Sequence, residues 1–391
     1  MYNEQMIQEL RKRWTALQQA LSREGGDAIL ITTNVNLFYV SGRVFSGAAY
    51  VPSEGDPLFF VRRPVGLKGD NVIYIRKPEE IAGHLQQRGI PMPGTLFLET
   101  DSISYNDYVR YEKIFSPRSV RNGTQLLRRV RSVKTIFEIG HIMRSGVLHA
   151  RAYERIPSLY RPGMTDTELS IEIERELRRL GSLGIFRVFG ESMEIYMGSL
   201  LAGDNADEPS PYDFALGGGG MDASLPVGGN GTLLTDGISV MVDMGGNFTG
   251  YMTDMTRVFS VGKLSDLAYK AHDTALEIQR LIEREARPGT PTADLYNLAV
   301  RTAAGAGLSD YFMGHRQQAG FIGHGIGIEI NEPPVLAPRS KEVLIPGMVF
   351  ALEPKFVIPS VGAVGVENSF LVTDNGIEKL THCEEAIVQL Q

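Results

Sequence analysis

The sequence predicts an α+β protein of two domains, and three observations lead to this prediction. A chain of 391 residues is longer than a single hydrophobic core usually supports. Helical and strand-like segments alternate in the first third of the chain, whereas in the remainder helices flank a strand-rich centre, which is typical of an α+β domain. We expect domains at residues 1–130 and 131–391. The boundary is placed in the basic segment 126–135, on its charge and on the change of pattern that follows.

The first domain is expected to begin with an amphipathic helix and to continue mainly in strands. Apolar residues recur every three or four positions over residues 4–24, which predicts a helix with one apolar face. The apolar runs at 27–33 and 36–42 predict buried strands. A hairpin is predicted over 48–63, because the sequence EGDP between two apolar runs favours a turn.

The second domain is expected to place helices around a central β region. Thr165 is the expected N-cap of one helix, because Glu168 three residues later completes a capping box. Four glycines at 217–220 interrupt the strands, and since they have no side chains to pack, we expect them in a mobile loop. The other predicted elements are helices from 136 to about 160, at 265–286 and at 291–306, with strands over 185–260 and 321–389.

Composition excludes several classes of partner. Hydrophobic residues make up 43% and charged residues 22% of the chain, and the net charge of −7 does not favour binding to nucleic acid or to an anionic membrane. No apolar run approaches the roughly 18 residues of a membrane span, and the mixed-charge N-terminus lacks the apolar core of a signal peptide. The single cysteine, Cys383, excludes an intrachain disulfide and favours a cytoplasmic protein.

A predicted hairpin over 237–262 brings two aspartates together. Two apolar runs flank the turn sequence NFTG, and a hairpin centred on that turn sets Asp243 opposite Asp254, with Cβ atoms roughly 5 Å apart. Facing carboxylates repel each other, so the pair is unfavourable unless a cation lies between them. The alternative is that Asp243 caps the turn and Asp254 is solvated, but the surrounding methionines and valine make a poor environment for a free carboxylate.

A second predicted hairpin repeats this arrangement with glutamates. The segment 348–373 has two apolar runs around a turn centred on Ser360, which sets Glu353 opposite Glu367. Glu353 lies in the otherwise apolar sequence VFALEP, where a lone glutamate must be neutral or paired. Two facing acidic pairs in one domain indicate a metal site.

A glycine-flanked histidine supplies the fifth candidate ligand. His324 lies in the sequence GHGIG, and we interpret the glycines as allowing metal and substrate to approach the backbone closely. Four carboxylates and one imidazole suit Mn²⁺, Co²⁺, Fe²⁺ or Zn²⁺. Four negative charges are sufficient for two divalent ions, the arrangement of two-metal hydrolases.

These residues, in this order and context, resemble the dinuclear metal site of the pita-bread metallopeptidases. That family includes methionine aminopeptidase, aminopeptidase P and prolidase, and this chain looks like a divergent member of its Xaa-Pro peptidase branch. The resemblance covers nearly the whole chain, and residues 29–42 are similar to the N-terminal domain of creatinase and prolidase. It is carried mainly by VDMGGNFTGYMTDMTRVF (242–259), FIGHGIGIEINEPP (321–334), LEPKF (352–356) and GVENSFLVTDNGIEKLT (365–381).

The resemblance implies a fold, an activity and partners. The C-terminal domain would have the pita-bread fold of creatinase and the aminopeptidases, preceded by a smaller α/β creatinase-like domain. The activity would be that of a metal-dependent Xaa-Pro dipeptidase or Xaa-Pro aminopeptidase, which acts on short proline-containing peptides through a hydroxide held between two divalent ions. Relatives of this kind are often homodimers.

The resemblance also implies a role for each ligand. Asp243 and Glu367 would bridge the two ions. Asp254 would complete the shell of one ion, and His324 with Glu353 that of the other. Glu353 is also the candidate general base, because it can lie beside the bridging water.

Three positions depart from the peptidase pattern. Asn331 and Val227 stand where the peptidases carry histidines that contact substrate, and Gly365 stands in place of an arginine. We retain Asn331 and Val227 as candidate substrate-binding residues, and we expect the glycine run 217–220 to lie over the substrate entrance. Asparagine can donate one hydrogen bond but cannot carry charge or pass on a proton. Weak activity on Xaa-Pro peptides, or a different substrate, is therefore expected.

Two alternatives remain open at this stage. One is an enzyme of the same fold with a non-peptide substrate, of the lyase or amidinohydrolase type. The other is a non-catalytic binding protein that has lost its metals. The complete set of five ligands argues against the second alternative, whereas the missing histidines keep the first one open.

Overall fold

The computed structural model describes residues 4–190 and 193–391 and divides the chain into two compact units, residues 1–131 and 132–391. Both units contain helices and strands. No helix within the described ranges is long and apolar enough to cross a membrane.

The N-terminal unit is a six-stranded mixed sheet with helices packed on it. The strand order is β4-β3-β2-β1-β5-β6, with β1 antiparallel to β2 and parallel to β5. The hydrophobic core lies between this sheet and helices such as α3 and α4. The elements are α1 (Glu4–Arg23), β1 (Ala28–Ile31), α2 (Asn34–Ser41), β2 (Ser46–Pro52), β3 (Leu58–Arg63), β4 (Val72–Tyr74), α3 (Glu80–Gln87), β5 (Thr95–Leu98), α4 (Tyr105–Phe115), β6 (Ser119–Asn122) and α5 (Thr124–Ser132).

The predicted strand at 36–42 is wrong, because this segment forms helix α2. The helix follows Thr33 and ends at Gly42, whose φ of 69° is the left-handed conformation of a helix C-terminus. Most of its side chains are buried, so the sequence carries no polar stripe. A short apolar run without such a stripe does not distinguish a buried helix from a buried strand.

The C-terminal unit contains three sheets and five α-helices among its described residues. The sheet orders are β17-β9-β8-β7, β11-β10-β12-β15-β16 and β13-β14. The helices are α6 (Ile136–Tyr153), α7 (Ile156–Leu159), α8 (Asp166–Arg179), α9 (Asp266–Glu285) and α10 (Thr292–Gly305), with 3-10 turns η1 (Gly203–Asp207) and η2 (Ser309–Tyr311). The strands are β7 (Gly198–Ala202), β8 (Ser239–Asn247), β9 (Met252–Val261), β10 (Gly323–Gly325), β11 (Glu332–Val335), β12 (Val349–Leu352), β13 (Lys355–Ile358), β14 (Gly362–Gly365), β15 (Asn368–Val372), β16 (Ile377–Lys379) and β17 (Val388–Leu390).

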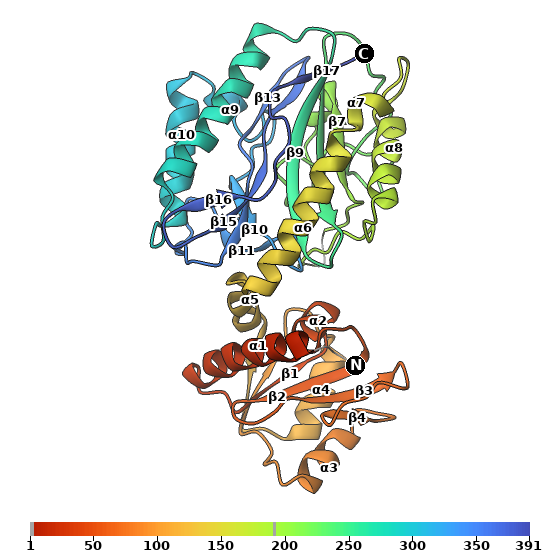
Figure 1. Ribbon diagram of the computed structural model, residues 1–391, viewed down its shortest axis with the longest axis vertical. Helices are drawn as coiled ribbons and strands as arrows, with labels where there is room; N and C mark the ends of the chain where they lie inside the picture. The colour runs from red at the N-terminus through yellow and green to blue at the C-terminus, as the bar shows by residue number, and fades with distance from the viewer. Residues whose placement is uncertain (1–3, 191–192) are drawn as a thin grey trace. The chain divides into compact units, whose positions relative to one another are not determined.

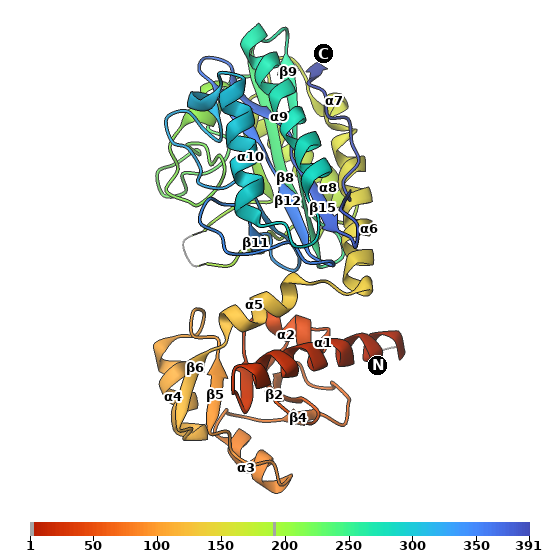
Figure 2. The same ribbon diagram turned by 90° about the vertical axis from the view of Figure 1, so that its left-hand side faces the viewer.

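Helices cover this β region on two sides. Figure 1 shows α6 and α8 on one side of the strands and α9 and α10 on the other, and in Figure 2 α9 and α10 lie in front of the strands. Apolar side chains of α9 and α10 form one core with β12, β13 and β14, and those of α6, α7 and α8 form another with β7, β8 and β9. The long strands β8 and β9 are therefore held between two cores.

Local capping signals were predicted well. Thr165 caps α8, its side chain accepts a hydrogen bond from the backbone of Glu168, and the reciprocal bond of the capping box is present. The boundaries of α9 and α10 lie within two residues of the predicted ones. Caps depend on residues three positions apart, so they are visible in sequence.

Candidate metal centre

The β8–β9 hairpin carries the two aspartates, in a register that differs from the predicted one. Asp243 pairs with Thr256, and Asp254 pairs with Gly245, so the predicted direct pairing of the aspartates is wrong by two residues. The last pair is Asn247 with Met252, which centres the turn one residue later than expected. Because a shift of two residues preserves the face of a strand, both carboxylates still lie on the same side of the hairpin.

The second hairpin has the predicted register. Lys355 pairs with Gly365 in β13–β14, Ser360 has a φ of 64° in the turn, and Leu352 pairs with Asn368 in β12–β15. Glu353 and Glu367 lie between these two pairs of strands, where the chain passes from the five-stranded sheet into the two-stranded one. The register on both sides sets the two glutamates opposite each other.

His324 lies on β10, next to the strand that leads into Glu353. It pairs with Ala351 of β12 and with Val335 of β11, and the β10–β11 register shifts between His324 and Gly325. This irregularity is of the kind expected from the glycine-rich sequence.

The glycines around His324 have a different purpose from the one predicted. A Cβ at Gly323 would lie 2.3 Å from the carbonyl oxygen of Ala351, and one at Gly325 would lie 2.0 Å from that of Pro333. The neighbouring strands of the protein itself, not metal or substrate, therefore require glycine at these positions. The interpretation of the glycines as space for ligand is wrong for Gly323 and Gly325.

The structure brings all five predicted ligands together. His324 Nε2 lies 3.7 Å from Asp254 Oδ2 and 3.4 Å from Glu353 Oε1. We call the whole set the acidic centre. It contains two groups of three residues, and within each group the potential ligand atoms lie within 4.8 Å of one another. The histidine group is formed by Asp254, His324 and Glu367. The lysine group is formed by Asp243, Glu353 and Glu367, and is named after Lys355, which contacts all three carboxylates.

Lys355 belongs to the acidic centre, and sequence reasoning missed it. Its Nζ lies 2.7 Å from Asp243 Oδ2, 2.7 Å from Glu353 Oε2 and 3.4 Å from Glu367 Oε2. The signal was present in the sequence, because the strand KFVI places a lysine in an apolar run two residues after Glu353. A lysine in the core is rare unless it is paired with carboxylates.

A network of hydrogen bonds holds Glu367 in place. Thr256 Oγ1 donates to Glu367 Oε2 at 2.6 Å, and Arg257 Nη1 donates to the Glu367 carbonyl at 2.8 Å. Arg257 also bonds Asn368 Oδ1 at 2.9 Å. These contacts join β9 to β15 and fix the two hairpins relative to each other.

Burial and mutual repulsion disfavour the charged forms of two carboxylates. Burial, together with the charges of Glu367, Asp243 and Glu353, raises the pKa of Asp254 well above its usual value. Burial also raises the pKa of Glu367 to about 8, despite the opposing effect of Lys355. Without a further cation, this part of the centre therefore retains protons near neutral pH.

Three other groups, His324, Glu353 and Lys355, show the opposite balance, because their neighbours favour the charged form. Burial disfavours the imidazolium of His324, but the nearby Glu353 raises its pKa to about 9. Burial would raise the pKa of Glu353, but Lys355 and His324 lower it to about 2. The ammonium of Lys355 is destabilised by burial, yet Asp243, Glu353 and Glu367 raise its pKa well above the usual value. Glu353 is therefore the ionised member beside the lysine.

The histidine group fits a divalent metal ion. Three buried carboxylate oxygens of the centre, Asp254 Oδ1, Glu353 Oε1 and Glu367 Oε1, have no hydrogen-bond partner among the described residues. Buried polar atoms are nearly always partnered, so three unpartnered oxygens on residues of one centre favour a bound cation. Carboxylate oxygens with one imidazole nitrogen are the donor set of Mn²⁺, Co²⁺, Fe²⁺ or Zn²⁺.

The two candidate substrate residues lie in different surroundings. The side-chain amide of Asn331 is engaged with the backbone of Phe189: Phe189 N–H donates to Oδ1 at 2.7 Å and Nδ2 donates to the Phe189 carbonyl at 2.8 Å. Val227 is buried. Asn331 thus holds the segment before β7 in place, a contact that the sequence did not indicate.

The glycine run 217–220 is not loosely packed, contrary to the prediction. Gly217 and Gly218 are buried, and a Cβ at Gly218 would lie 2.4 Å from Leu201 and 2.6 Å from the carbonyl of Gly228. Asn205 bonds both Gly219 N–H and the Gly228 carbonyl, at 2.9 and 3.0 Å. Because glycines have no side chains, neighbouring segments pack directly against the backbone of this run. These backbone contacts hold the run in place although it has no side chains of its own to bury.

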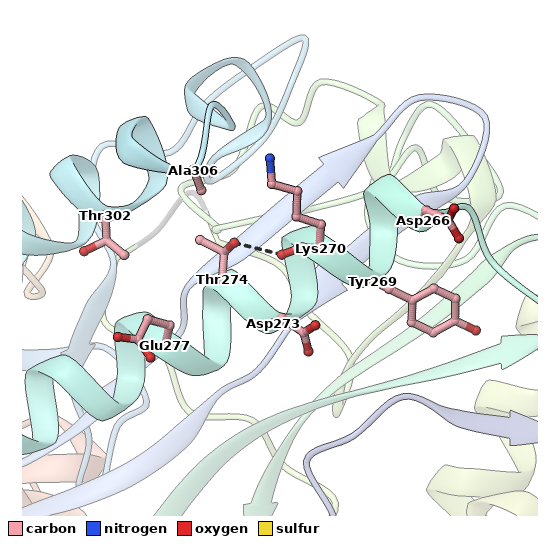
Figure 3. A pocket seen from close by; sticks show the side chains of 8 residues that line it. All are labelled: Asp266, Tyr269, Lys270, Asp273, Thr274, Glu277, Thr302 and Ala306. Atoms are coloured by element: carbon pink, nitrogen blue, oxygen red, sulfur yellow. Dashed lines mark hydrogen bonds between the residues drawn. The ribbon is translucent and has the colours of Figure 1, made fainter.

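A hollow of about 510 Å³ on α9 and α10 is a weaker candidate site. Its lining includes Asp266, Lys270, Asp273 and Glu277, and Figure 3 shows these side chains pointing in different directions along the exposed face of α9. The charged groups do not converge on one point. The acidic centre, where buried charged groups converge, is the better candidate for chemistry.

Comparison with known proteins places the chain in a family. Residues 140–374 match metallopeptidase family M24, and residues 13–133 match the creatinase/prolidase N-terminal domain. The uncharacterized peptidase YqhT of Bacillus subtilis is 27% identical over 385 residues, which cover 96% of this chain and 99% of that protein. A Xaa-Pro dipeptidase of Pyrococcus furiosus is 24% identical and covers 97% of this chain and 100% of its own length.

Solved structures show the same fold over both units. The Xaa-Pro dipeptidase from Bacillus anthracis has a TM-score of 0.79 at 24% identity, covering 97% of this chain and 100% of that chain. The prolidase from Pyrococcus horikoshii has a TM-score of 0.77 at 21% identity, covering 96% and 100%. Because the family match spans more than half of the chain and includes the whole acidic centre, this protein belongs to metallopeptidase family M24, with a creatinase-type N-terminal domain and a pita-bread C-terminal domain.

Proposed function

We propose that this protein is a metal-dependent hydrolase that cleaves bonds next to proline in short peptides, as an Xaa-Pro dipeptidase or Xaa-Pro aminopeptidase. The observation that carries the proposal is the buried acidic centre, whose oxygens at Asp254, Glu353 and Glu367 have no hydrogen-bond partner among the described residues and are suitable ligands for a cation. Similarity to an Xaa-Pro dipeptidase along nearly the whole chain supports the substrate class.

We assign metal binding and proton transfer to different residues of the centre. Asp254, His324 and Glu367 would hold a divalent ion, which when bound acts as a Lewis acid toward a carbonyl and lowers the pKa of water. Glu353 is the candidate general base: its Oε1 has no hydrogen-bond partner among the described residues, while its Oε2 is fixed by Lys355 at 2.7 Å. Oε1 is thus available to accept a proton, and the contact of Oε2 with Lys355 fixes the orientation of the carboxylate.

The side chains of the centre differ in their exposure to solvent. The side chains of Asp243 and His324 are 20% and 16% exposed, whereas those of Glu353 and Glu367 are 4% and 1% exposed. A peptide would therefore approach over Asp243 and His324. The low exposure of the glutamates keeps bulk water away from the groups that carry the charge.

A non-peptide substrate is the second candidate, and one observation favours it. At position 331 the amide is engaged with the backbone of Phe189, and Val227 has no group that ionises. Neither position therefore offers a charged donor to a tetrahedral anion. A non-peptide substrate whose reaction develops no such anion would not need those donors. We also propose a cytoplasmic homodimer, as expected from the single cysteine and from the resemblance.

The test is hydrolysis of a panel of Xaa-Pro dipeptides and longer Xaa-Pro peptides, with Xaa-Ala peptides as controls, after loading with Mn²⁺ or Co²⁺. We expect Xaa-Pro cleavage at least about 10²–10³-fold below the roughly 10 s⁻¹ of a typical enzyme, because the loss of one such donor has this cost and two positions lack the histidine. Asn331→His is expected to change this rate more than Val227→His, because Val227 is buried. A metal-loaded protein that cleaves no peptide of the panel would refute the peptidase proposal and favour the non-peptide alternative.

A further inference from the structure

The lysine group already contains a cation. Lys355 Nζ contacts all three carboxylates of this group, at 2.7, 2.7 and 3.4 Å, and the lysine side chain is fully buried. An ammonium group has three N–H donors, so each of them has a carboxylate within reach. Lys355 therefore has no donor left for a substrate.

The position of this ammonium excludes a metal ion bound by the same oxygens. A divalent ion of this class lies about 2.0–2.2 Å from carboxylate oxygens. The Nζ atom lies at 2.7 Å from both Asp243 Oδ2 and Glu353 Oε2, so an ion bridging those two oxygens would overlap the ammonium. A like-charged ion beside it would also be repelled strongly in a buried site.

The fold makes room for the lysine and gives it no alternative place. Lys355 pairs with Gly365 across the β13–β14 hairpin, and a Cβ at Gly365 would lie 2.8 Å from Lys355 Cα and 3.3 Å from its Cγ. Any side chain at 365 would therefore displace the lysine stem. Moving the ammonium away from its three carboxylates would leave a buried charge unpaired, which is strongly unfavourable.

The histidine group differs in having no ammonium. Its Asp254 Oδ1 and Glu367 Oε1 are buried without a hydrogen-bond partner among the described residues. In the lysine group, by contrast, each carboxylate places one oxygen against Nζ, including the second oxygen of the shared Glu367. We propose that Lys355 permanently replaces one of two metal ions, so that the acidic centre binds a single divalent ion at Asp254, His324 and Glu367. This inference rests on the proposed metal dependence but not on the identity of the substrate.

The test is the number of ions bound per folded chain, measured by elemental analysis and by calorimetric titration with Mn²⁺ in the absence of substrate. We expect one ion for the wild-type protein and two for Lys355→Ala, which vacates the second position. Lys355→Arg keeps the charge and is expected to bind one ion. Lys134→Met is the matched control, because Lys134 is equally buried and is paired with Glu332 at 3.0 Å; it is expected to bind one ion.

A second measurement keeps the inference falsifiable if Lys355→Ala does not fold. The electron paramagnetic resonance spectrum of the Mn²⁺-loaded wild-type protein should show an isolated ion, not a spin-coupled pair. Two ions in the wild-type protein, or a folded Lys355→Ala that still binds one, would overturn the inference. A wild-type protein that binds one ion but cleaves no Xaa-Pro peptide would refute the proposed substrate while supporting the role of Lys355.

Discussion

Two buried carboxylate sites, one in each unit, are satisfied in opposite ways. Glu99, directly after β5, accepts hydrogen bonds from the backbone N–H groups of Thr32 and Thr33 at 2.6 and 2.9 Å and from Asn36 Nδ2 at 2.6 Å. Both of its oxygens have neutral donors. The acidic centre instead combines four carboxylates with one ammonium and leaves three oxygens unpartnered among the described residues.

The difference separates a structural carboxylate from a binding site. Glu99 ties the end of β1 to α2 and needs nothing from outside the protein. The acidic centre is complete only when a cation is added, so its residues contribute to binding at the expense of stability. The comparison predicts that substitutions at the two sites will have opposite effects on activity and on stability.

The largest expected effect is on activity. Asp254→Asn keeps the shape of the side chain but removes one of the ligand charges of the histidine group. We expect it to lower kcat/KM on the best Xaa-Pro peptide by at least about 10³-fold, because metal binding is weakened. Glu99→Gln, measured per folded molecule in the same assay, is expected to stay within about threefold of the wild-type value. Equal losses in both variants would remove the distinction between the sites.

Stability should change in the other direction. Glu99→Gln replaces an acceptor of several hydrogen bonds, so it is expected to lower the free energy of unfolding by about 2–3 kcal/mol. In the metal-free protein, Asp254→Asn is expected to raise it by about 1–3 kcal/mol at pH 8, because a buried carboxylate with a raised pKa no longer has to be accommodated.

The pH dependence checks the sign of the Asp254 effect. A group whose pKa is raised on folding destabilises the folded state increasingly as the pH rises above the unfolded value. The gain from Asp254→Asn should therefore disappear near pH 4. Urea titrations of metal-free protein at the two pH values measure this. A constant difference between variant and wild type would contradict the electrostatic explanation.

The acidic centre can be predicted from two local patterns in the sequence: the positions of the turns, and the alternation of side chains between the two faces of a strand. The turn at Ser360 and the opposition of Glu353 and Glu367 follow from a local pattern, and so does the capping box at Thr165. The predicted pairing of Asp243 with Asp254 is wrong by two residues, because a turn centred one residue later shifts every pair. Because a shift of two residues preserves the face of a strand, both aspartates still lie on the predicted side of the hairpin, and the predicted site is unchanged.

What could not be predicted depends on contacts between distant segments. The role of Lys355 depends on carboxylates from distant segments: Asp243 on β8 and Glu367 after β14 reach its Nζ only in the folded protein. The sequence favours ligand access for the glycines beside His324 and mobility for the run 217–220, whereas backbone carbonyls of other segments lie within 3 Å of a Cβ at Gly323, Gly325, Gly218 and Gly220. A single sequence shows that a side chain is absent but not which neighbour fills its space.

The titration of a third buried group, His149, should change the free energy of unfolding by about 2 kcal/mol between pH 7.5 and pH 5. Its Nδ1 lies 3.1 Å from Thr253 Oγ1, and its Nε2 has no partner among the described residues. Burial, with the nearby charge of Arg257, lowers its pKa to about 3. Between the unfolded value of about 6.5 and that pKa, the unfolded state binds the extra proton, so stability falls as pH falls.

The measurement compares the free energy of unfolding of wild type and His149→Gln at about pH 7.5 and pH 5. We expect the wild type to lose about 2 kcal/mol more than the variant over this interval, because glutamine does not titrate. Other titrating groups are common to both proteins and cancel in the difference. Parallel pH profiles would mean that the histidine is accessible to protons in the folded state.

The smallest expected effect concerns Asn331. Asn331→Ala removes both hydrogen bonds to the backbone of Phe189 and is expected to lower the free energy of unfolding by about 1–2 kcal/mol. Asn331→Asp keeps the acceptor and should recover about half of that loss. If both variants unfold like the wild type while their KM values rise, the amide acts on substrate and not on the Phe189 segment.

The central claim, that the acidic centre is a metal site with one position taken by Lys355, is tested most directly by anomalous diffraction. Crystals of the wild-type protein soaked in Mn²⁺ would be measured at a wavelength with strong manganese scattering. We predict one anomalous peak, bounded by Asp254, His324 and Glu367, with the Lys355 ammonium still between Asp243 and Glu353. A peak at the position of the ammonium, or no peak among these residues, would contradict the account.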